Sequence, residues 1–310
     1  MTMTPFFSVV IPVYNRTALL GRALRSVLAQ SEQDFEIVVV DDGSTDNPSR
    51  TVEELADPRI VFARQENRGG GAARNTGIDK ARGRFIAFLD SDDRFLPHHL
   101  ASMRGLLENA PGTAGYARIL VERGEGRTFL KPPRAIREGE NMATYLLCER
   151  GFIPTSTMVV ERKMAQAIRF HEHLPAAEDT DFAIRLALAG QRFVMAQEPG
   201  VQWNDSGDPG RLSAGRKSAT MRPWIEELRP RIPAKAYYGC LGWAYAKHVA
   251  MNDRFAALKL YLGALVRGCY RPSLALIVFL QIFLSDSAYR KLADTAIARF
   301  GAGLRPGSAP

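Results

Sequence analysis

The sequence predicts an α/β fold in which a parallel sheet is flanked by helices on both faces. Three observations support this prediction. Short, almost continuous apolar runs recur along the first hundred residues, and segments with helical spacing of apolar residues lie between them. Strands that are apolar throughout are typical of parallel sheets, because both faces of such a sheet are covered. Turn-forming sequences such as DDGSTD and ENRGGG separate the runs.

The predicted strands and helices alternate from the N-terminus. Apolar runs predict strands at Phe7–Ile11, Phe35–Val40, Ile60–Ala63 and Phe85–Leu89. Helical spacing predicts helices at Thr17–Gln30, Ser49–Ala56, Ala72–Arg82 and from the Leu96-Pro97 turn to Asn109. This alternation is expected when parallel strands are joined by helical crossovers.

The rest of the chain divides into a less regular part and a helical part. We expect a hairpin from Tyr116–Val121 and Thr128–Leu130, strands at Thr157–Glu161 and Phe193–Ala196, and a helix at Asp181–Ala189. Helices are expected from about Ser218 onward, and one at Asp253–Val266 carries an apolar stripe of Phe255, Leu258, Leu262, Leu265 and Val266. We therefore expect an α/β domain over residues 1–217 and a basic helical region over 218–310 that ends in a flexible tail.

Positive charge is concentrated in the last third of the chain. The whole chain has a formal charge of +8, yet residues 217–310 hold 14 Lys and Arg against five Asp and Glu, and residues 1–216 hold 27 against 28. This asymmetry points to an anionic surface as a partner. Peripheral contact with a membrane fits better than nucleic acid, because no recognised nucleic-acid-binding module is present. A helical subdomain with a solvated basic face is the simpler alternative.

Three features predict a cytoplasmic protein, which could lie at the cytoplasmic face of a membrane. Cys148, Cys240 and Cys269 are odd in number and far apart in sequence, which favours a reducing compartment. The N-terminal residues lack the basic segment and long apolar core of a signal peptide. The longest apolar run, Leu274–Leu284, has 11 residues and is too short to span a bilayer.

Acidic residues follow two of the predicted strands. DDGSTD follows the second strand, and the fourth leads into DSDD at positions 90–93. Ligands of open parallel sheets bind beyond the carboxyl ends of the strands. Asp90 and Asp92 can present oxygens to the same side of an extended chain, and Mg²⁺ or Mn²⁺ with a diphosphate would neutralise them. The alternative is a solvated acidic turn that caps the next helix.

Two further segments could belong to the same site. ENRGGGAARN opens a helix, where glycines allow close approach of a ligand and free N–H groups favour anions, although a flexible turn is the alternative. Glu178 and Asp179 precede another helical run. Asp179 could be a helix N-cap, or a carboxylate held at a helix start to serve as a general base.

These segments resemble a known family. PVYNR, FEIVVVDDGSTD, ENRGGGAARNTGI, GRFIAFLDSDD and AEDTDFAIRLALAG occur in the order and approximate spacing of the family 2 glycosyltransferases, over about Phe6–Ser213. The resemblance implies the GT-A fold, a Rossmann-like, mostly parallel sheet flanked by helices, here followed by a C-terminal helical extension. It also implies inverting, metal-dependent transfer of a sugar from a nucleotide-sugar donor, most simply a UDP-sugar. The acceptor would be a hydroxyl of a glycan or lipid-linked molecule in cell-surface polysaccharide or glycolipid biosynthesis.

The resemblance implies roles for single residues, with residues 1–217 as the catalytic domain. The residues that would contact the donor are Pro12, Tyr14, Asp41, Asp42, Arg74, Asp90 and Arg211. Asp92 and Asp93 would hold Mn²⁺ or Mg²⁺ on the donor's diphosphate, and the choice of metal ligand among Asp90, Asp92 and Asp93 stays open. Asp179 would be the catalytic base, with Glu178 as its neighbour.

One departure from the family pattern narrows the prediction. Processive synthases of this family typically carry a QxxRW motif after the base, whereas this chain has VQWNDSGDPGRLS. We therefore expect transfer of a single sugar. No histidine lies between Val201 and Ser213, where some relatives place one near the metal, so Asp205 or Asp208 could replace it.

Two other function classes stay open at the level of sequence. A sugar-nucleotide pyrophosphorylase would also be α/β with metal-binding carboxylates, but it would need a Gly-rich loop with Arg and Lys after the first strand. PVYNRTALLGRAL has no such loop. A catalytically inactive binding or scaffold protein could share the fold, although the intact DSDD and Glu-Asp segments argue against it.

Overall fold

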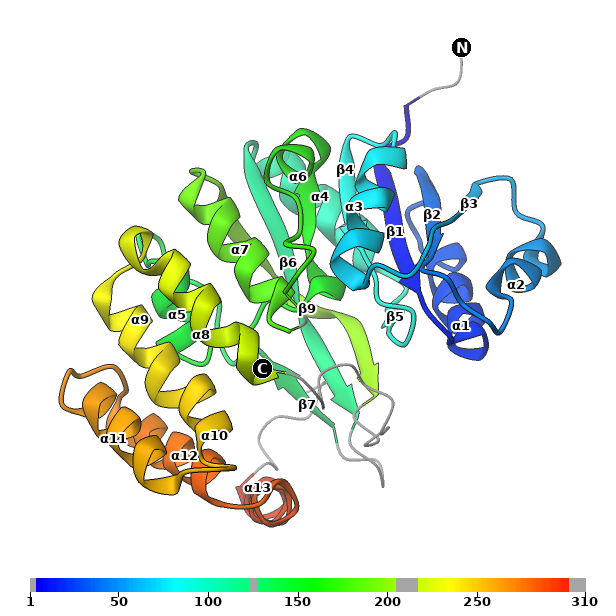
Figure 1. Cartoon of the computed structure of the whole chain (residues 1–310). Helices are drawn as coiled ribbons and strands as arrows, with labels where there is room; N and C mark the ends of the chain where they lie inside the picture. The colour runs from blue at the N-terminus through cyan, green and yellow to red at the C-terminus, as the bar shows by residue number, and fades with distance from the viewer. Residues whose placement is uncertain (1–3, 123–127, 175, 205–216, 301–310) are drawn as a thin grey trace. The chain divides into compact units, whose positions relative to one another are not determined.

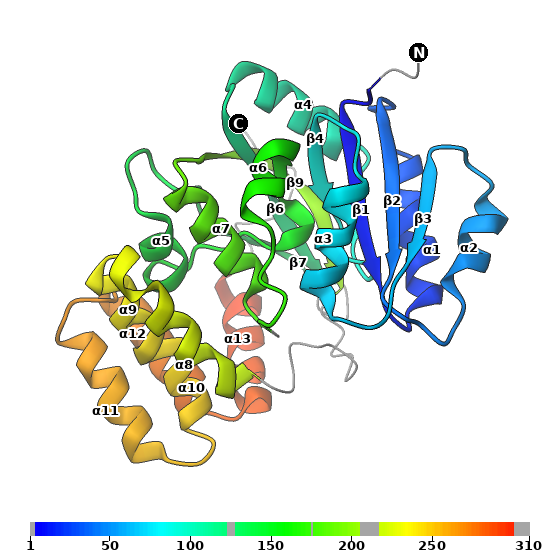
Figure 2. The ribbon, with the colours of Figure 1, turned by 45° about the horizontal axis from the view of Figure 1, so that its top comes forward.

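The computed structural model of the chain describes residues 4–122, 128–174, 176–204 and 217–300 (Figures 1 and 2). The chain divides into two compact units. The first, an α/β unit, comprises residues 1–142 and 150–216, and the second, a helical unit, comprises 143–149 and 217–310. The segment 143–149 therefore packs with the C-terminal helices, although it is surrounded in sequence by the α/β unit.

One sheet forms the centre of the α/β unit, and it has nine strands in the part of the chain that the structure describes. The strands are β1 (Phe7–Val13), β2 (Phe35–Asp41), β3 (Ile60–Arg64), β4 (Phe85–Phe88), β5 (Arg94–Phe95), β6 (Thr113–Glu122), β7 (Thr128–Lys131), β8 (Val159–Glu161) and β9 (Arg192–Asn204). Their spatial order is β3-β2-β1-β4-β8-β6-β9-β5, with β7 beside β6. The first four strands are parallel, as predicted, and β8 then pairs antiparallel with β4 and β6.

The last long strand, β9, extends well beyond the predicted Phe193–Ala196. It pairs in parallel with β6 as far as Asn204, with a register irregularity near the middle. Pro199 and Gly200 obscure this continuation in the sequence, because proline and glycine usually mark the end of a strand. Gly200 is needed for packing, since a Cβ there would lie 2.1 Å from Nδ1 of the buried His99.

Helices cover both faces of this sheet (Figures 1 and 2). They are α1 (Thr17–Leu28), α2 (Pro48–Leu55), α3 (Gly70–Lys80), α4 (His99–Asn109), α6 (Arg162–Ile168) and α7 (Glu178–Leu188). The predicted helices are confirmed with shifts of a few residues at their ends, whereas the short α6 was not predicted. It has only seven residues, too few for an apolar period to be evident.

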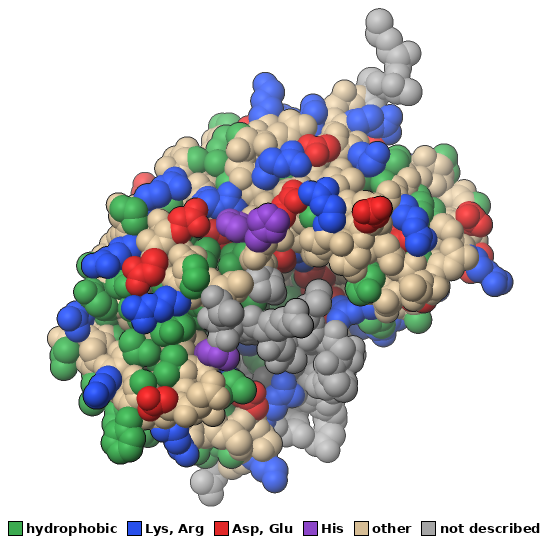
Figure 3. Space-filling view, viewed as in Figure 1, with side chains coloured by type: hydrophobic (Ala, Val, Ile, Leu, Met, Phe, Trp, Pro, Cys, Tyr) green, Lys and Arg blue, Asp and Glu red, His purple; other side chains and the backbone are tan. Residues whose placement is uncertain are grey.

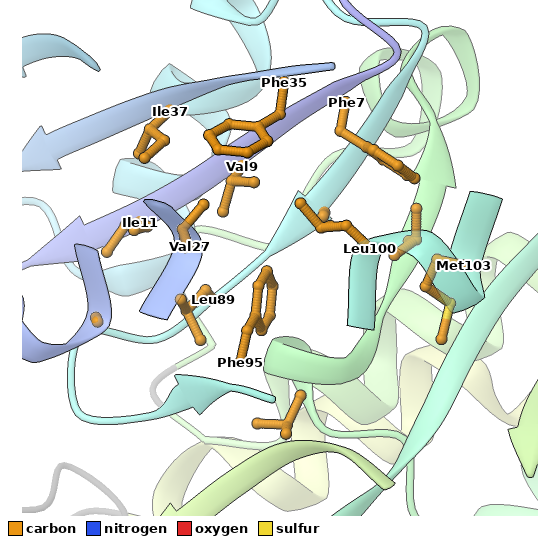
Figure 4. Close-up of a cluster of buried hydrophobic side chains, with 14 of the residues drawn as sticks. Phe7, Val9, Ile11, Val27, Phe35, Ile37, Leu89, Phe95, Leu100 and Met103 are labelled. Carbon is orange, nitrogen blue, oxygen red and sulfur yellow. The ribbon is translucent and has the colours of Figure 1, made fainter. Parts of the chain in front are cut away.

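One hydrophobic core lies between the sheet and the helices α1 and α4. Figure 4 shows Val9 of β1 and Ile37 of β2 near Val27 of α1, with Leu100 and Met103 of α4 farther along the same layer. All five side chains are fully buried. Alternate residues of each strand point to this layer, which is why continuous apolar runs are required: the other alternate residues face α3, α6 and α7.

An aromatic cluster fixes α7 to the other face of the sheet. The ring of Phe88, near the end of β4, lies 5.1 Å from that of Phe170 and 5.9 Å from that of Phe182 in α7. Phe170 and Phe182 are stacked with their centroids 4.1 Å apart. Because Phe88 is two residues before Asp90, and Phe182 lies one turn after Glu178, this packing sets the distance between the two acidic segments.

The helical unit consists of helices, of which α9 and α10 are joined without a break by the π-helical segment Leu241–Tyr245. Its helices are α5 (Met142–Cys148, of which Met142 belongs to the α/β unit), α8 (Lys217–Leu228), α9 (Ala234–Cys240), α10 (Ala246–Val249), α11 (Arg254–Leu265), α12 (Pro272–Phe283) and α13 (Asp286–Phe300). Cys148, Cys240 and Cys269 are buried here as free thiols. Burial raises the pKa of Cys148 and Cys240 to about 12, so both are poor nucleophiles.

The apolar stripe predicted for α11 exists, but most of it is exposed. Phe255 and Val266 are each 80% exposed, whereas Ala257, Tyr261 and Ala264 on the other side of the helix are buried. Small residues and a tyrosine form the packed side, so the largest apolar side chains are not the buried ones. Among the described residues, no helix is long and apolar enough to cross a membrane.

The close packing of α3 on β1 predicts the effect of a single methyl group. A Cβ at Gly77 would lie 2.3 Å from Cγ1 of the fully buried Val10. We expect Gly77→Ala to lower the free energy of unfolding by about 1–3 kcal/mol, measured by urea denaturation, because overpacking outweighs the gain in helix propensity.

Gly105→Ala in α4 is the matched control. Its Cβ would meet nothing within 4 Å, so this variant should be unchanged or more stable by up to about 1 kcal/mol. Equal stability of the two variants would contradict the packing assigned to α3.

Candidate active site

Hydrogen bonds and ion pairs connect the five segments singled out in the sequence: PVYNR, DDGSTD, the ENRGGG turn with AARN, DSDD and the Glu178-Asp179 pair. Asn15 at the end of PVYNR contacts DDGSTD, DDGSTD contacts the ENRGGG turn, and Arg74 in AARN contacts both DSDD and Glu178. Arg16 adds a direct link from PVYNR to DSDD. The predicted convergence of these segments at the carboxyl ends of β1, β2 and β4 is therefore present in the fold.

The turns after β1 and β2 hold each other in place. The backbone N–H of Asn15, which has a left-handed φ of 50°, donates to Oγ of Ser44 at 2.9 Å. In return the N–H of Thr45 donates to Oδ1 of Asn15 at 2.8 Å. Tyr14, expected to stack on the nucleotide base, is 43% exposed beside this turn. Pro12 lies within β1 and is only partly buried.

Asp42 anchors the glycine-containing turn that opens α3. Its Oδ1 accepts from the side-chain amide of Gln65 and the N–H of Arg68, and its Oδ2 accepts from the N–H of Gly69 at 2.8 Å. Asp42 is only 3% exposed. The carboxylate predicted to contact the donor base is thus first of all a structural acceptor for this turn, and a ligand would use its remaining lone pairs.

Asp41, the other acid of DDGSTD, is fully buried at the end of β2. Its Oδ1 accepts from the N–H of Ser44 at 2.8 Å, and its Oδ2 lies 3.2 Å from Nη1 of Arg64. Asp41 thereby closes its own turn, as side chains at the start of such turns commonly do.

Two positions of this turn require glycine for structural reasons, Gly69 for its backbone conformation and Gly71 for close packing. Gly69 has a φ of 91°, a left-handed conformation that side chains rarely adopt. A Cβ on Gly71 would lie 2.9 Å from the carbonyl oxygen of His171. The glycines that the sequence suggested for ligand approach therefore also allow the chain before α7 to pack on α3.

Arg74 is the central side chain of the site. Its Nη2 lies 2.6 Å from Oδ1 of Asp90, and its Nη1 lies 2.7 Å from Oε2 of Glu178. The guanidinium is 9% exposed and lies 5.3 Å from the ring of Phe170. Burial opposes its charge, but the charges of Asp90 and Glu178 outweigh burial and raise the pKa of Arg74. Arg74 thus joins the acidic end of β4 to the start of α7.

The other carboxylates of DSDD have different partners. Oδ2 of Asp92 lies 2.8 Å from Nη1 of Arg16, and Oδ2 of Asp93 accepts from the hydroxyl of Ser156 at 2.5 Å. The same hydroxyl oxygen accepts from the N–H of Asp90 at 3.1 Å. Asp93 is 7% exposed and held inward. Asp92 is about one fifth exposed, which makes it the more accessible of the two predicted metal ligands.

The donor set fits a cation that shares its coordination with a phosphate ligand. Within the described residues, no group of three His, Cys, Asp or Glu side chains could enclose a metal ion. Mg²⁺ and similar hard cations usually take only one or two carboxylates when phosphates and water complete the shell. Asp92 and Asp90, whose side chains are 20% and 33% exposed, are the carboxylates of DSDD that could supply such ligands.

The two acids at the start of α7 differ in their surroundings. Glu178 is held on both oxygens, because Oε1 accepts from the N–H of Gly71 and Oε2 pairs with Arg74. Asp179 accepts on Oδ1 from the N–H of Thr180 at 2.7 Å. Burial, and then the charge of Glu178, raise the pKa of Asp179 above its ordinary value. Asp179 therefore binds a proton more readily than an exposed aspartate.

Sequence reasoning named most of this constellation but missed three partners. Arg16, Arg68 and Ser156 were given no role, although Arg16 lies in a quoted motif and Arg68 in the glycine-containing turn. Ser156 lies in a short 3₁₀ turn, Thr155–Thr157, with no signal in its sequence. Arg211, Asp205 and Asp208 lie outside the described residues.

A family model described as glycosyl transferase family 2 matches residues 8–169. The amylovoran biosynthesis glycosyltransferase AmsB of Erwinia amylovora is 31% identical over 244 residues, which cover 75% of this chain and 80% of AmsB. The chain belongs to glycosyltransferase family 2. The succinoglycan biosynthesis protein ExoW of Rhizobium meliloti strain 1021 is 35% identical over 217 residues, or 63% of this chain and 67% of ExoW.

Solved structures agree on the fold of this glycosyltransferase. The match to S. aureus TarS 1-349 in complex with UDP-GlcNAc has a TM-score of 0.65 at 19% identity. It covers 95% of this chain and 92% of the TarS chain. The mannosyltransferase PcManGT of Pyrobaculum calidifontis, in complex with GDP-Man and Mn²⁺, has a TM-score of 0.59 at 19% identity, with coverages of 94% and 88%. The expected GT-A fold is confirmed. The family-model match ends before α7, so Glu178 and Asp179 lie outside it.

The buried pairing of Arg74 predicts a large effect for its loss in this glycosyltransferase. Arg74→Met would leave Asp90 and Glu178 without their shared counter-charge in a partly buried place. We expect the free energy of unfolding to fall by about 3 kcal/mol, measured by urea denaturation, because the cost of an uncompensated charge is added to the lost attraction.

Arg50→Met is the control for this measurement. Arg50 pairs with Glu54 across one helical turn with both side chains largely exposed, so its loss should change stability by less than about 0.5 kcal/mol. A stable Arg74→Met protein would show that α7 is held by the aromatic cluster alone.

Proposed function

We propose that this glycosyltransferase transfers a single sugar from a nucleotide-sugar donor, in the first instance a UDP-sugar, to a hydroxyl of a glycan or lipid-linked acceptor. The transfer inverts the anomeric configuration. The main support is the two-sided ion pair of Arg74, which links the donor-side Asp90 to the Glu178-Asp179 pair. One side chain would thereby join the proposed phosphate-binding end of the site to the proposed proton acceptor.

Asp179 is proposed as the general base and Glu178 as its positioning neighbour. Glu178 has both oxygens engaged, by Arg74 and by the N–H of Gly71, so it is poorly placed to accept a proton. Asp179 has one oxygen held by Thr180, which fixes the carboxylate at the helix start. Its raised pKa makes it a stronger base than an exposed aspartate, as removal of a hydroxyl proton requires.

A direct displacement needs no enzyme nucleophile. Asp179 accepts the proton of the acceptor hydroxyl while that oxygen bonds to the anomeric carbon, and the bond to the nucleoside diphosphate breaks on the opposite face. One displacement of this kind inverts the configuration. The buried thiols of the helical unit take no part, and their raised pKa values agree with that.

Asp92 is proposed to hold Mn²⁺ or Mg²⁺ together with the donor's diphosphate, with Asp90 or Asp93 as the second carboxylate. Such a cation would neutralise charge that develops on the leaving diphosphate. Arg16 pairs with Asp92 and keeps it oriented in the absence of a ligand. Asp93 is held by Ser156 and is less accessible, which favours Asp90 as the partner of Asp92.

The donor's nucleoside is proposed to lie at the ends of β1 and β2. Exposed Tyr14 offers a ring for the base, with Pro12 at the edge, and Asp42 offers the unused lone pairs of its carboxylate. Asp41 stabilises this turn by accepting a hydrogen bond from the N–H of Ser44. Arg74, at 9% exposure, is proposed to act on the donor by orienting Asp90 rather than by broad contact of its own. Arg211 stays a proposed phosphate contact.

The relatives support a role in polysaccharide synthesis. AmsB and ExoW are named for the biosynthesis of amylovoran and succinoglycan. TarS was solved with UDP-GlcNAc and PcManGT with GDP-Man and Mn²⁺, which supports a metal-assisted nucleotide-sugar site on this fold. We propose that the protein builds a cell-surface polysaccharide or glycolipid from the cytoplasmic side of a membrane. Nucleic acid is not proposed as a partner.

The first experiment measures donor use directly. UDP-glucose, UDP-galactose, UDP-N-acetylhexosamines and a nucleotide-rhamnose should be tested for binding and slow hydrolysis, with Mn²⁺ and with EDTA. We expect one donor to be hydrolysed, with loss of activity in EDTA and weakened Mn²⁺ stimulation in Asp92→Asn. Neither binding nor turnover with any donor would reject the transferase and favour the scaffold alternative.

A second experiment assigns the base. Asp179→Asn should lower the rate of transfer by about 10²–10⁴-fold while donor affinity stays nearly constant, because only proton removal is lost. In the unsubstituted enzyme the rate should fall on acidification at a pH above the ordinary range of aspartate, since the base must be ionised and burial raises its pKa.

The control for this substitution is Asp79→Asn. Asp79 forms an exposed ion pair with Arg169, so its loss should leave the rate unchanged. An Asp179→Asn enzyme with full activity would remove Asp179 from the mechanism.

A further inference from the structure

The helical unit exposes a continuous set of apolar side chains that its own packing does not use. We call this set the apolar face: Phe255, Leu262 and Val266 of α11, with Leu276 and Phe279 of α12. Their exposed fractions are 80, 45, 80, 61 and 39%. Hydrophobic side chains that are exposed singly are common, but five on two neighbouring helices are characteristic of a contact surface.

The two helices of the apolar face lie side by side. The hydroxyl of Tyr261 in α11 donates to the carbonyl oxygen of Ala275 in α12 at 3.0 Å, and its ring lies 5.6 Å from that of Phe279. Arg254 at the start of α11 donates to the carbonyl oxygen of Phe283 at the end of α12. These contacts make the helices antiparallel neighbours, so their exposed sides form one surface.

The internal packing of the unit uses the opposite sides of both helices. Ala257, Tyr261 and Ala264 of α11 are buried, as are Val278 and Ile282 of α12. The side chains of the apolar face therefore do not belong to the hydrophobic core of the helical unit. Figure 3 shows hydrophobic and basic side chains, with a few acidic ones, interspersed in the region where Figure 1 places α9 to α11.

The charges around the apolar face are mostly basic, although exposed Asp253 is the N-cap residue of α11 and Glu149 pairs with Arg271 at 3.2 Å. Between Arg254 and Ser285 there are four basic residues and no Asp or Glu. The basic residues are Arg254, Lys259, Arg267 and Arg271, all of them exposed. Lys259 lies between Phe255 and Leu262 on the same side of α11, since residues three and four apart share a helix face.

We propose that the apolar face docks on the surface of an anionic lipid bilayer. Phe255, Val266 and Leu276 would enter the boundary between headgroups and acyl chains, and the surrounding basic side chains would contact lipid phosphates. Long Lys and Arg side chains suit this position, because their aliphatic stems lie in the apolar layer while the charges reach the headgroups. The excess of basic residues favours anionic lipid over a second copy of the chain, because two such faces would bring like charges together.

This inference goes beyond the transfer reaction and does not depend on it. A basic region could be attracted to a membrane without a defined contact surface. The apolar face is a defined surface on which apolar contact is as important as charge. Electrostatic attraction alone would be spread over all 14 basic residues at positions 217–310 and would be weak at physiological salt. Attachment through the apolar face would be less sensitive to salt.

The test is vesicle binding by the full chain. Sedimentation with vesicles of phosphatidylglycerol and phosphatidylcholine, and with phosphatidylcholine alone, should show strong binding only to the anionic mixture. The double variant Phe255→Ser/Val266→Ser should bind the anionic vesicles at least about tenfold more weakly, because it removes two side chains that enter the bilayer. Lys259→Gln should weaken binding by about fivefold.

Two controls make the result decisive. Val61→Thr changes an exposed apolar residue of the α/β unit and should bind vesicles normally. The double variant should keep the unfolding temperature of the original protein, since both side chains lie outside its core. Vesicle binding by the double variant equal to that of the original protein would overturn the proposal, as would a dimer in solution, measured by light scattering, that the same two substitutions dissociate.

Discussion

The buried guanidinium of Arg74 is the interaction on which the arrangement of this site depends. A permanently charged group at 9% exposure is costly unless carboxylates accept its N–H groups, and here Asp90 and Glu178 do so from opposite sides. Three parts of the chain must therefore meet at this point. α3 supplies the guanidinium, the end of β4 supplies one carboxylate acceptor, and the start of α7 supplies the other. The aromatic packing of Phe88 with Phe182 holds the same two acidic segments at a fixed spacing, so the core and the ion pairs support one geometry.

Three carboxylates can follow one strand because each has a separate partner. Asp90 pairs with Arg74, Asp92 with Arg16 and Asp93 with Ser156, and these partners come from α3, the start of α1 and a 3₁₀ turn before β8. Their mutual repulsion is thereby offset by the chain itself. The two acids at the start of α7 also differ. Both carboxylate oxygens of Glu178 have partners, whereas Asp179 is held through Oδ1 by the N–H of Thr180. The acids of the two segments thus differ in how far contacts within the chain engage them.

The two units differ in how they use apolar residues. Every central strand of the α/β unit is covered on both faces. In these strands the large apolar side chains are buried. In α11 apolar residues occur around the whole helix, and alanines with Tyr261 form the packed side. Periodicity alone cannot identify the buried side of such a helix. The neighbours of the helix decide it: Ala264 packs against Gly242, Tyr261 donates a hydrogen bond to Ala275 of α12, and the larger Phe255 and Val266 remain at the surface.

The sequence by itself determined the alternation of strands and helices, the parallel order of the first strands, and the acidic segments of the site. These features depend on local patterns: continuous apolar runs, helical spacing, and turn residues at strand ends. Four results were decided only by the tertiary structure: the continuation of β9 through Pro199 and Gly200, the solvent-facing side of α11, the pairing of Arg16 with Asp92, and the role of Ser156. Each depends on residues far apart in the chain, whose contacts arise from packing and burial that no local pattern encodes.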